Sequence, residues 1–371
     1  MAAPSAVTSL VTDAHGRTAS RSPCDARVRQ SPSRHADTTT AGSPGHPTAS
    51  NDGSTTTNLP ARPKVSGVIT VLSGGVGAAR LLRALRDHDS DVELSAVVNV
   101  GDDLVMHGLT ICPDLDTIMY TLARANNDEL GWGLAGETWR VKQRLGELGG
   151  EDWFALGDLD LATHLYRSQR LAQGATKTEV TRELAVRLGL DVALLPVSDD
   201  VIATEFDTEV GPLSFQEYFV RHHHDVVVSA VRVRGAAAAR LSEQSRDALE
   251  RSERIVIAPS NPLISIDPIL RVPGVLDILT RRRDDVVAVS PLVGGAALKG
   301  PADRLMRELG HDVNAVGVAR IYAGLVGTMI IDVLDADQAD AVAATGCDVR
   351  VTTTVMSDPV HARALAEAVR T

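Results

Sequence analysis

Hydrophobic residues form a short run where the patterned part of the chain begins. Val68–Leu72 is apolar and ends in Ser-Gly-Gly. Apolar residues at helical spacing then follow at Ala79, Leu81, Leu82 and Leu85, and this spacing predicts an amphipathic helix. The two segments together predict a first strand, turn and helix unit.

A second apolar run, Leu94–Val98, predicts a buried strand, and Thr117–Ala125 predicts a helix after it. Between about residues 126 and 190, apolar residues recur three or four positions apart. This spacing predicts a mainly helical insertion. Its helices are expected at Glu137–Leu148, Leu161–Ala172 and Glu179–Leu188.

Strand-like runs return in the second half of the chain. They are Val201–Thr204, Asp225–Val233, Arg254–Ala258, Val286–Ser290 and Asp348–Val355. Strands that alternate with helices are typical of α/β proteins. We therefore predict a Rossmann-like α/β fold, with an open, mostly parallel sheet and helices on both faces. In such folds ligands bind at the carboxyl ends of the strands, so the turns that follow the strands carry the candidate sites.

Residues 1–66 show no such periodicity and are rich in Ser, Thr, Pro, Ala and His. A segment of this composition cannot bury enough apolar surface to offset the entropy of ordering it. We predict a disordered N-terminal tail over 1–66 and a folded domain over 67–371.

Composition and charge narrow the class of protein. Aromatic residues are only 3% of the chain, so the core is expected to consist of Val, Leu, Ile and Ala. The net charge of −11 argues against a nucleic-acid partner, because that affinity comes from clustered Lys and Arg. No apolar run reaches the roughly 18 residues of a membrane span, and the three cysteines form no C-x-x-C pair. A cytoplasmic protein without a membrane partner is expected.

The first turn, Ser73-Gly74-Gly75-Val76-Gly77, follows a predicted strand and opens a predicted helix. Its backbone N–H groups and the helix dipole favour an anion, and glycine lets a phosphate approach closely. The third glycine of a dinucleotide fingerprint would fall on Arg80, and the G-K-[ST] ending of a Walker loop is absent. The turn therefore predicts phosphate binding, with a purely structural tight turn as the alternative.

Acidic residues follow the second predicted strand. Asp102 and Asp103 end it, and Asp114 and Asp116 return to the same rim. Because Mg²⁺ prefers oxygen ligands and bridges carboxylates to phosphates, we predict that Asp102 or Asp103 holds a metal. Asp114 and Asp116 are candidates for substrate contact or coordination. The alternative is that these aspartates cap a turn and a helix.

Later turns add further candidates. Ser260 and Asn261 offer short polar side chains at a strand end, suited to a base or ribose. Lys299 can place a point charge on a phosphate, and His164 can contact substrate from a helix that Asp158 or Asp160 caps. Ordinary loop chemistry and simple packing are the alternatives. All four strand-end loops are expected at one edge of one sheet.

Seven motifs in order carry a resemblance to a known family. They are Ser73-Gly-Gly-Val-Gly, Asn99-Val-Gly-Asp-Asp, His107-Gly-Leu, Pro113-Asp-Leu-Asp-Thr, Gly157-Asp-Leu-Asp-Leu-Ala-Thr-His, Ala258-Pro-Ser-Asn-Pro and Ser290-Pro-Leu-Val-Gly-Gly. From about Val68 to Thr371 the chain resembles the 2-phospho-L-lactate transferase family of coenzyme F420 biosynthesis. The related gluconeogenesis-factor branch, which binds nucleotide sugars, is the alternative. It has Gly-Gly-Ser-Ser after the acid pair, where this chain has Leu104-Val105-Met106-His107.

The resemblance implies a nucleotide-binding transferase domain over 67–371. Its implied reaction moves a phosphoenolpyruvyl or 2-phospho-L-lactyl group from a GDP-activated donor to the ribityl hydroxyl of the deazaflavin Fo. GMP is released, Mg²⁺ is required, and a homodimer is implied. On this chain Asp102 and Asp103 are the predicted catalytic and metal-binding residues: one would bind the metal, and the other would orient or deprotonate the attacking hydroxyl. Donor contacts fall to Ser73, Gly74, Gly75, Gly77, Ser260, Asn261 and Lys299, and deazaflavin contacts to Asp102, Asp114, Asp116, Arg140 and His164.

Overall fold

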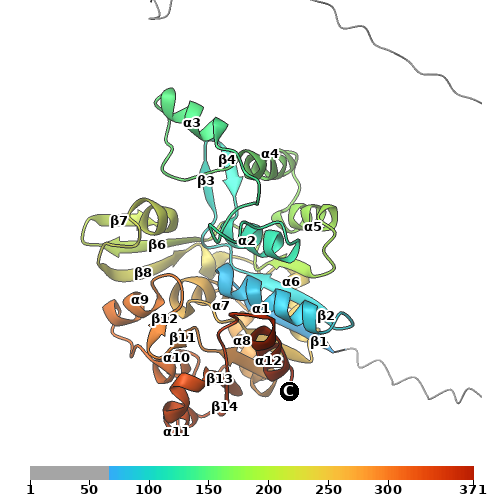
Figure 1. The fold of residues 1–371 in the computed structure, drawn as a ribbon, viewed down its shortest axis with the longest axis vertical. Coiled ribbons are helices and arrows are strands. Elements are labelled where there is room, and N and C mark those ends of the chain that lie inside the picture. The colour runs from blue at the N-terminus through green and yellow to red at the C-terminus, as the bar shows by residue number, and fades with distance from the viewer. Residues whose placement is uncertain (1–66) are drawn as a thin grey trace, which may run out of the picture. The chain divides into compact units, whose positions relative to one another are not determined.

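The computed structural model describes residues 67–371, so the predicted tail over 1–66 lies outside the described residues. A seven-stranded sheet lies at the centre (Figure 1), and all its paired strands run parallel. In spatial order its strands are β14 (Asp348–Thr352), β13 (Thr328–Asp332), β10 (Val286–Val289), β9 (Arg254–Ile257), β1 (Val68–Ser73), β2 (Glu93–Val98) and β5 (Ala193–Pro196).

Helices cover both faces of this sheet. On one face, Val71 and its neighbours pack against α1 (Gly75–His88), α2 (Pro113–Leu122), α5 (Lys177–Arg187) and α12 (Pro359–Arg370). On the other face, Leu72 and its neighbours pack against α6 (Glu243–Arg251), α7 (Asp267–Leu270), α8 (Val275–Arg281), α9 (Ala302–Glu308) and α10 (Ala315–Ile321). Adjacent residues of a strand face opposite sides, so a strand between two helical layers must be apolar throughout. The predicted α/β class with helices on both faces is confirmed.

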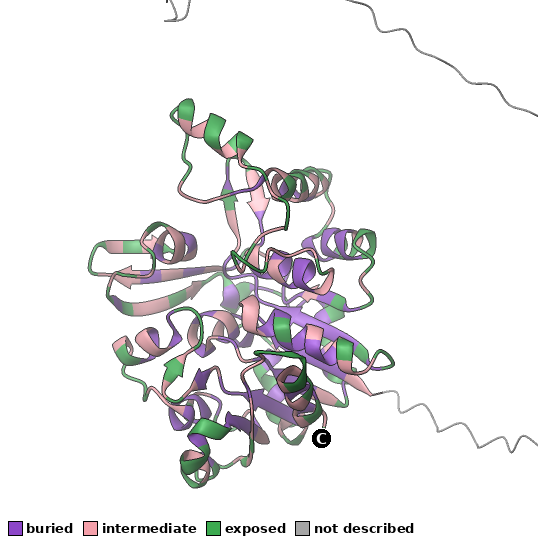
Figure 2. Ribbon diagram, viewed as in Figure 1, coloured by how far each residue is buried: buried purple, intermediate pink, exposed green. Residues whose placement is uncertain are grey.

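Three further α-helices and two short hairpins lie outside the main sheet and the two helical layers described above. The segment before β5 contains α3 (Arg140–Glu147) and α4 (Asp158–Ala172) ahead of α5, and α3 has no buried residue (Figure 2). The helix α11 (Ala339–Ala343) precedes β14. The hairpins are β3 (Leu104–Met106) with β4 (Leu109–Ile111) and β11 (Leu292–Val293) with β12 (Ala296–Ala297).

The sequence assigned two strands to the wrong sheet. The runs Val201–Thr204 and Asp225–Val233 overlap β6 (Ala203–Thr208) and β8 (Val228–Arg234), which pair antiparallel in a separate sheet with β7 (Gly211–Ser214). Only Thr204 and Phe206 of β6 are buried. A strand with one buried face suits an antiparallel sheet better than a parallel core.

The sequence also missed two strands of the main sheet, β5 and β13. Three helices begin earlier than predicted. The helix α4 starts three residues early and α5 two residues early, and α2 starts at Pro113 and not near Thr117. Proline is well suited to the first position of a helix, where its missing N–H has no partner to lose. As a result Asp114 and Asp116 lie inside the first turn of α2.

Candidate functional site

The candidate site lies where the strand order of the main sheet reverses. From β1 the chain moves to β2 on one side, and β9 later pairs with the other side of β1. The turns after β1 and β9 touch here, since the Ser260 hydroxyl donates to the Gly74 carbonyl at 2.7 Å. Such switch points are where open α/β sheets bind ligands. The expectation that the strand-end loops share one edge agrees with this parallel sheet.

The glycine turn is closely packed except at its centre. A side chain on Gly77 would come within 2.3 Å of the Pro259 carbonyl, and one on Gly74 within 2.7 Å of Ser265 Cβ. Gly75 has a φ of +70°, a backbone conformation that favours glycine. The space where a side chain would lie is almost empty, which leaves room for a ligand.

The Gly75 N–H donates to Asp114 Oδ1 at 2.7 Å. Gly75 begins α1, so the Asp114 carboxylate stands at the positive end of that helix dipole. An anion is therefore stabilised here, and in this structure the anion comes from the protein's own side chain. The observation supports an anion site at the glycine turn.

Asn99 joins two buried carboxylates. Its Nδ2 donates to Asp102 Oδ1 at 3.0 Å and to Asp114 Oδ2 at 2.9 Å, while its Oδ1 accepts from the Gly101 N–H. Within residues 67–371, neither Asp102 nor Asp114 forms an ion pair. Burial, followed by the charge of Asp114, raises the pKa of Asp102 well above its usual range. Burial also raises the pKa of Asp114 to about 6.

Asp103, the neighbour of Asp102, has a different environment. Its Oδ2 lies 2.5 Å from the Nζ of Lys177, and both side chains are largely buried. Burial alone would lower the pKa of Lys177, but the attraction of Asp103 outweighs it, so this pKa lies above its usual value. The acid pair is therefore unequal: one member has a fixed cation and the other has none.

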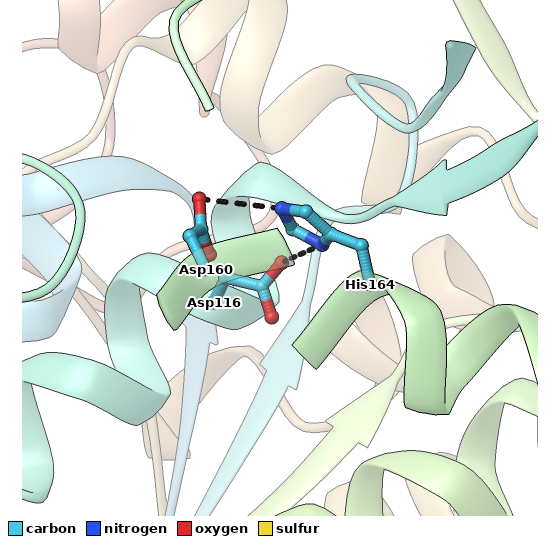
Figure 3. Close-up of side chains that lie close together, drawn as sticks. All are labelled: Asp116, Asp160 and His164. Carbon is cyan, nitrogen blue, oxygen red and sulfur yellow. Dashed lines mark ion pairs between the residues drawn. The ribbon is translucent and has the colours of Figure 1, made fainter. Parts of the chain in front are cut away.

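A second buried cluster joins α2 and α4 (Figure 3). The Arg167 guanidinium donates to both oxygens of Asp116 and, at 3.1 Å, to His164 Nδ1. Because arginine has no acceptor, His164 Nδ1 must accept, which leaves the imidazole proton on Nε2. That Nε2 lies 3.2 Å from Asp160 Oδ2 without good hydrogen-bond alignment, and Tyr120 donates to Asp160 Oδ1 at 2.7 Å.

The residues Asp116, Asp160 and His164 could hold a metal, since one ligand atom from each lies within 4.8 Å of the others. The predicted metal pair, Asp102 and Asp103, is not in this group. The guanidinium of Arg167 already supplies a positive charge to Asp116. A metal ion here would have to compete with that cation, so the geometry favours a hydrogen-bonded ion-pair cluster.

The capping prediction around His164 is wrong. The N-cap of α4 is Gly157, with no side-chain bond, and Asp158 and Asp160 lie inside the helix. Glu137 instead accepts the N–H groups of Leu159 and Asp160. Asp158, the first residue of α4, in turn accepts the Val141 N–H at the start of α3. The start of α4 is therefore capped from the segment before α3, and the start of α3 is capped from α4.

The structure brings some of the remaining predicted residues to the site and places others elsewhere. The Ser73 hydroxyl is buried and donates to the Val71 carbonyl, while Asn261 caps the next turn through its Oδ1 and keeps a buried Nδ2 without a partner within 67–371. Lys299 is exposed, with its Nζ beside Gly131 in the loop after α2. Arg140 is exposed at the first position of α3.

Sequence reasoning missed the residues that hold the acids in place. These are Asn99, Lys177, Arg167, Tyr120 and Gln216, whose Nε2 donates to the Asp102 carbonyl at 3.0 Å. One signal was available, because Asn99 is the first residue of the Asn-Val-Gly-Asp-Asp motif. The others lie far along the chain from their partners.

The fold and this edge define a doubly wound α/β protein with buried carboxylates at its topological switch point. The model of the family described as 2-phospho-L-lactate transferase CofD matches residues 69–365, and the chain belongs to that family. It is 40% identical over 296 residues to a phosphoenolpyruvate transferase of Streptomyces griseus, covering 78% of this chain and 93% of the relative. It is 38% identical over 297 residues to a 2-phospho-L-lactate transferase of Methanosarcina acetivorans, covering 80% and 96%.

Among solved structures, the chain resembles a member of the UPF0052 family from Bacillus halodurans. The TM-score is 0.54 with 17% sequence identity, over 82% of this chain and 98% of that one. At this identity the likeness shows the fold alone. Within the described part of the chain, no helix combines the length and the apolar character needed to cross a membrane.

Proposed function

We propose that this transferase moves a phosphoenolpyruvyl or 2-phospho-L-lactyl group from a GDP-activated donor to the ribityl hydroxyl of the deazaflavin Fo and releases GMP. The proposal places the chain in coenzyme F420 biosynthesis, as a cytoplasmic homodimer. Relatives with both names match at nearly equal identity. Because the two donors differ by only two hydrogens, the choice between them is left to the experiment below.

The observation that carries the proposal is a pair of buried carboxylates at the positive end of the α1 dipole, neither of which has a cation within residues 67–371. Asp102 and Asp114 share the Asn99 amide, and Asp114 reaches the Gly75 N–H. A purely structural role would favour a neutral or ion-paired cluster, since an unpaired buried charge is costly. A site that binds Mg²⁺ and a diphosphate explains why two acids with raised pKa values, and not two neutral side chains, are kept here.

The donor is proposed to lie along the switch point. The N–H groups of Ser73–Gly77 would bind its phosphates, and Ser260 and Asn261 would face the guanosine. The buried, unpartnered Asn261 Nδ2 supports a polar ligand there. The Lys299 ammonium, beside Gly131, would add positive charge at the phosphates. Group transfer at phosphorus depends mainly on such positioning and charge neutralisation.

The oxygen donors fit Mg²⁺, which prefers carboxylate ligands. Asp102 would be its ligand, because its Oδ2 accepts no hydrogen bond from any residue within 67–371. Bound there, the ion would neutralise phosphate charge and favour departure of GMP. Asp103 would orient the attacking hydroxyl, and the Asn99 amide would keep Asp102 and Asp114 in place.

The deazaflavin is proposed to lie on the side of α2 and α4. Asp102, Asp114 and Arg140 would contact it. Asp116 and His164 are almost fully buried and bonded to Arg167, so in this proposal they shape the wall of the deazaflavin site through that cluster. The deciding experiment incubates the purified protein with Fo, Mg²⁺ and each activated donor, with mass detection of the product. Absence of product together with tight nucleotide-sugar binding would identify the regulatory alternative.

A further inference from the structure

Lys177 occupies an unusual place for a lysine. It is the first residue of α5, after the Thr176 cap, where the helix dipole disfavours a positive charge. Its side chain is only 10% exposed, although lysines are almost never fully buried unless they are paired. Neither helix stability nor solubility accounts for a buried cation at this position. Its ion pair with Asp103 does.

The charges around the site show what this ion pair changes. Asp102, Asp103 and Asp114 are three carboxylates at one sheet edge: Asp102 and Asp114 share the Asn99 amide, and Asp103 is the chain neighbour of Asp102. The ammonium of Lys177, 2.5 Å from Asp103, cancels that third charge. Asp102 is thus left as the member of the adjacent pair that lacks a cation.

We infer that Lys177 is a positioning residue, which ties Asp103 to α5 so that Asp102 alone of the pair is open to a divalent cation. The predicted effect on the donor KM rests on the proposed function. The predicted effect on Mg²⁺ binding does not. Lys177 sets the charge of the site at a value that attracts Mg²⁺ without repelling an anionic diphosphate. It touches neither ligand itself and acts through Asp103.

The variant Lys177→Met tests this. It frees the Asp103 carboxylate and adds one negative charge beside Asp102. By calorimetric titration we expect Mg²⁺ to bind about tenfold more tightly, the low end of what one close charge does to an ionic equilibrium. In the same variant, the KM for the anionic donor should rise about tenfold or more. A lysine that served only structure would loosen both ligands together when removed.

Two control variants keep the test decisive. Lys177→Arg preserves the charge and should leave Mg²⁺ affinity and donor KM near the wild-type values. The double variant Lys177→Met with Asp103→Asn replaces the ion pair by two neutral groups of similar size. It is expected to fold even if the single variant does not, and to restore wild-type Mg²⁺ affinity. Unchanged or weaker Mg²⁺ binding in Lys177→Met, or binding in the double variant as tight as in the single one, would overturn the inference.

If Lys177→Met does not fold, the other two variants decide. Mg²⁺ affinity in the double variant that differs from wild type by tenfold or more would contradict the charge account, and so would failure of Lys177→Arg to retain wild-type affinity. The proposed function is tested separately by product formation in the wild-type protein. If the wild-type protein forms no product but the variants show the expected Mg²⁺ affinities, the proposed function is rejected and the role of Lys177 stands.

Discussion

Two buried carboxylates, Asp114 and Asp116, lie in the first turn of α2 and belong to two different clusters. The two clusters are stabilised in different ways. Asp116 faces α4, where Arg167 donates to both of its oxygens. Asp114, two residues earlier, faces the glycine turn and Asn99 and has no cation within the described residues. The first cluster is complete without a ligand. The second is left short of positive charge.

The difference indicates how the two clusters contribute to the protein. A buried acid with its own arginine holds two elements together without a ligand. A buried acid without a cation destabilises the folded chain unless something binds. We therefore assign structure to the Asp116 cluster and chemistry to the Asp102 and Asp114 cluster, and the predictions below test that division.

The largest effect on stability is expected for Arg167→Met. It would leave Asp116 charged, buried and without a partner, a change that typically costs about 3–5 kcal/mol of unfolding free energy. Urea unfolding measures it. The matched control is Arg170→Met on the same helix, whose partly exposed pair with Glu183 should contribute about 1 kcal/mol or less. Equal losses in both variants would show that the Asp116 cluster is not a structural ion pair.

Asp102→Asn should have the opposite profile. It replaces a buried acid that has no cation within the described residues by a neutral group of similar shape, so the unfolding free energy should stay equal or rise. Turnover should fall by about 10²–10³, the usual size for loss of one group that stabilises transition-state charge. A Mg²⁺ titration of turnover measures the effect, and Asp102→Asn should require much more Mg²⁺ than Asp103→Asn. Wild-type turnover in both variants at low Mg²⁺ would make the acid pair a structural turn.

The pH dependence of stability should follow Asp114. Burial raises its pKa to about 6 in the folded chain, against an ordinary value of 3.8, so the folded state holds more protons between these values. The contribution of Asp114 to the unfolding free energy must then fall as the pH rises from about 4 to about 6 and level off above that, by about 1–3 kcal/mol. Asp114→Asn should flatten this slope in denaturant melts. A slope unchanged by the substitution would mean that Asp114 is ionised throughout.

The sequence predicted the part of the site that depends on local order. Val68–Leu72, the glycine turn and the helix after it are contiguous, and parallel strands bring the later loops to the same edge. The runs at Val201–Thr204 and Asp225–Val233 were recognised as extended, but an apolar run does not say which sheet it joins. In the structure these runs become β6 and β8, which pair antiparallel with each other, and β6 also pairs with β7.

The partners of the acids could not be predicted in the same way. Asp114 meets Gly75 across 39 residues, Arg167 meets Asp116 across 51, and Lys177 meets Asp103 across 74. These pairings depend on how α1 and α2 pack together, how α2 packs against α4, and where α5 lies relative to Asp103. Their spacing along the chain gives no periodic signal. The candidate acids could therefore be identified from the sequence. Which of them are paired with a cation could be seen only in the structure.

A small effect on stability, and the sharpest test of the anion site, is expected for Gly75→Ala. Gly75 and Gly174 both have positive φ angles, +70° and +91°. Alanine at either position should cost about 1–2 kcal/mol of unfolding free energy. A methyl group on Gly75 would project into the open space beside Asp114, where we place the diphosphate, whereas one on Gly174 would meet nothing within 4 Å. Calorimetric titration should therefore show GDP affinity lowered at least about tenfold, equivalent to 1.4 kcal/mol, in Gly75→Ala and unchanged in Gly174→Ala. If GDP binds both variants equally well, backbone strain is the only effect of the substitution, and the glycine turn is a structural feature without a phosphate.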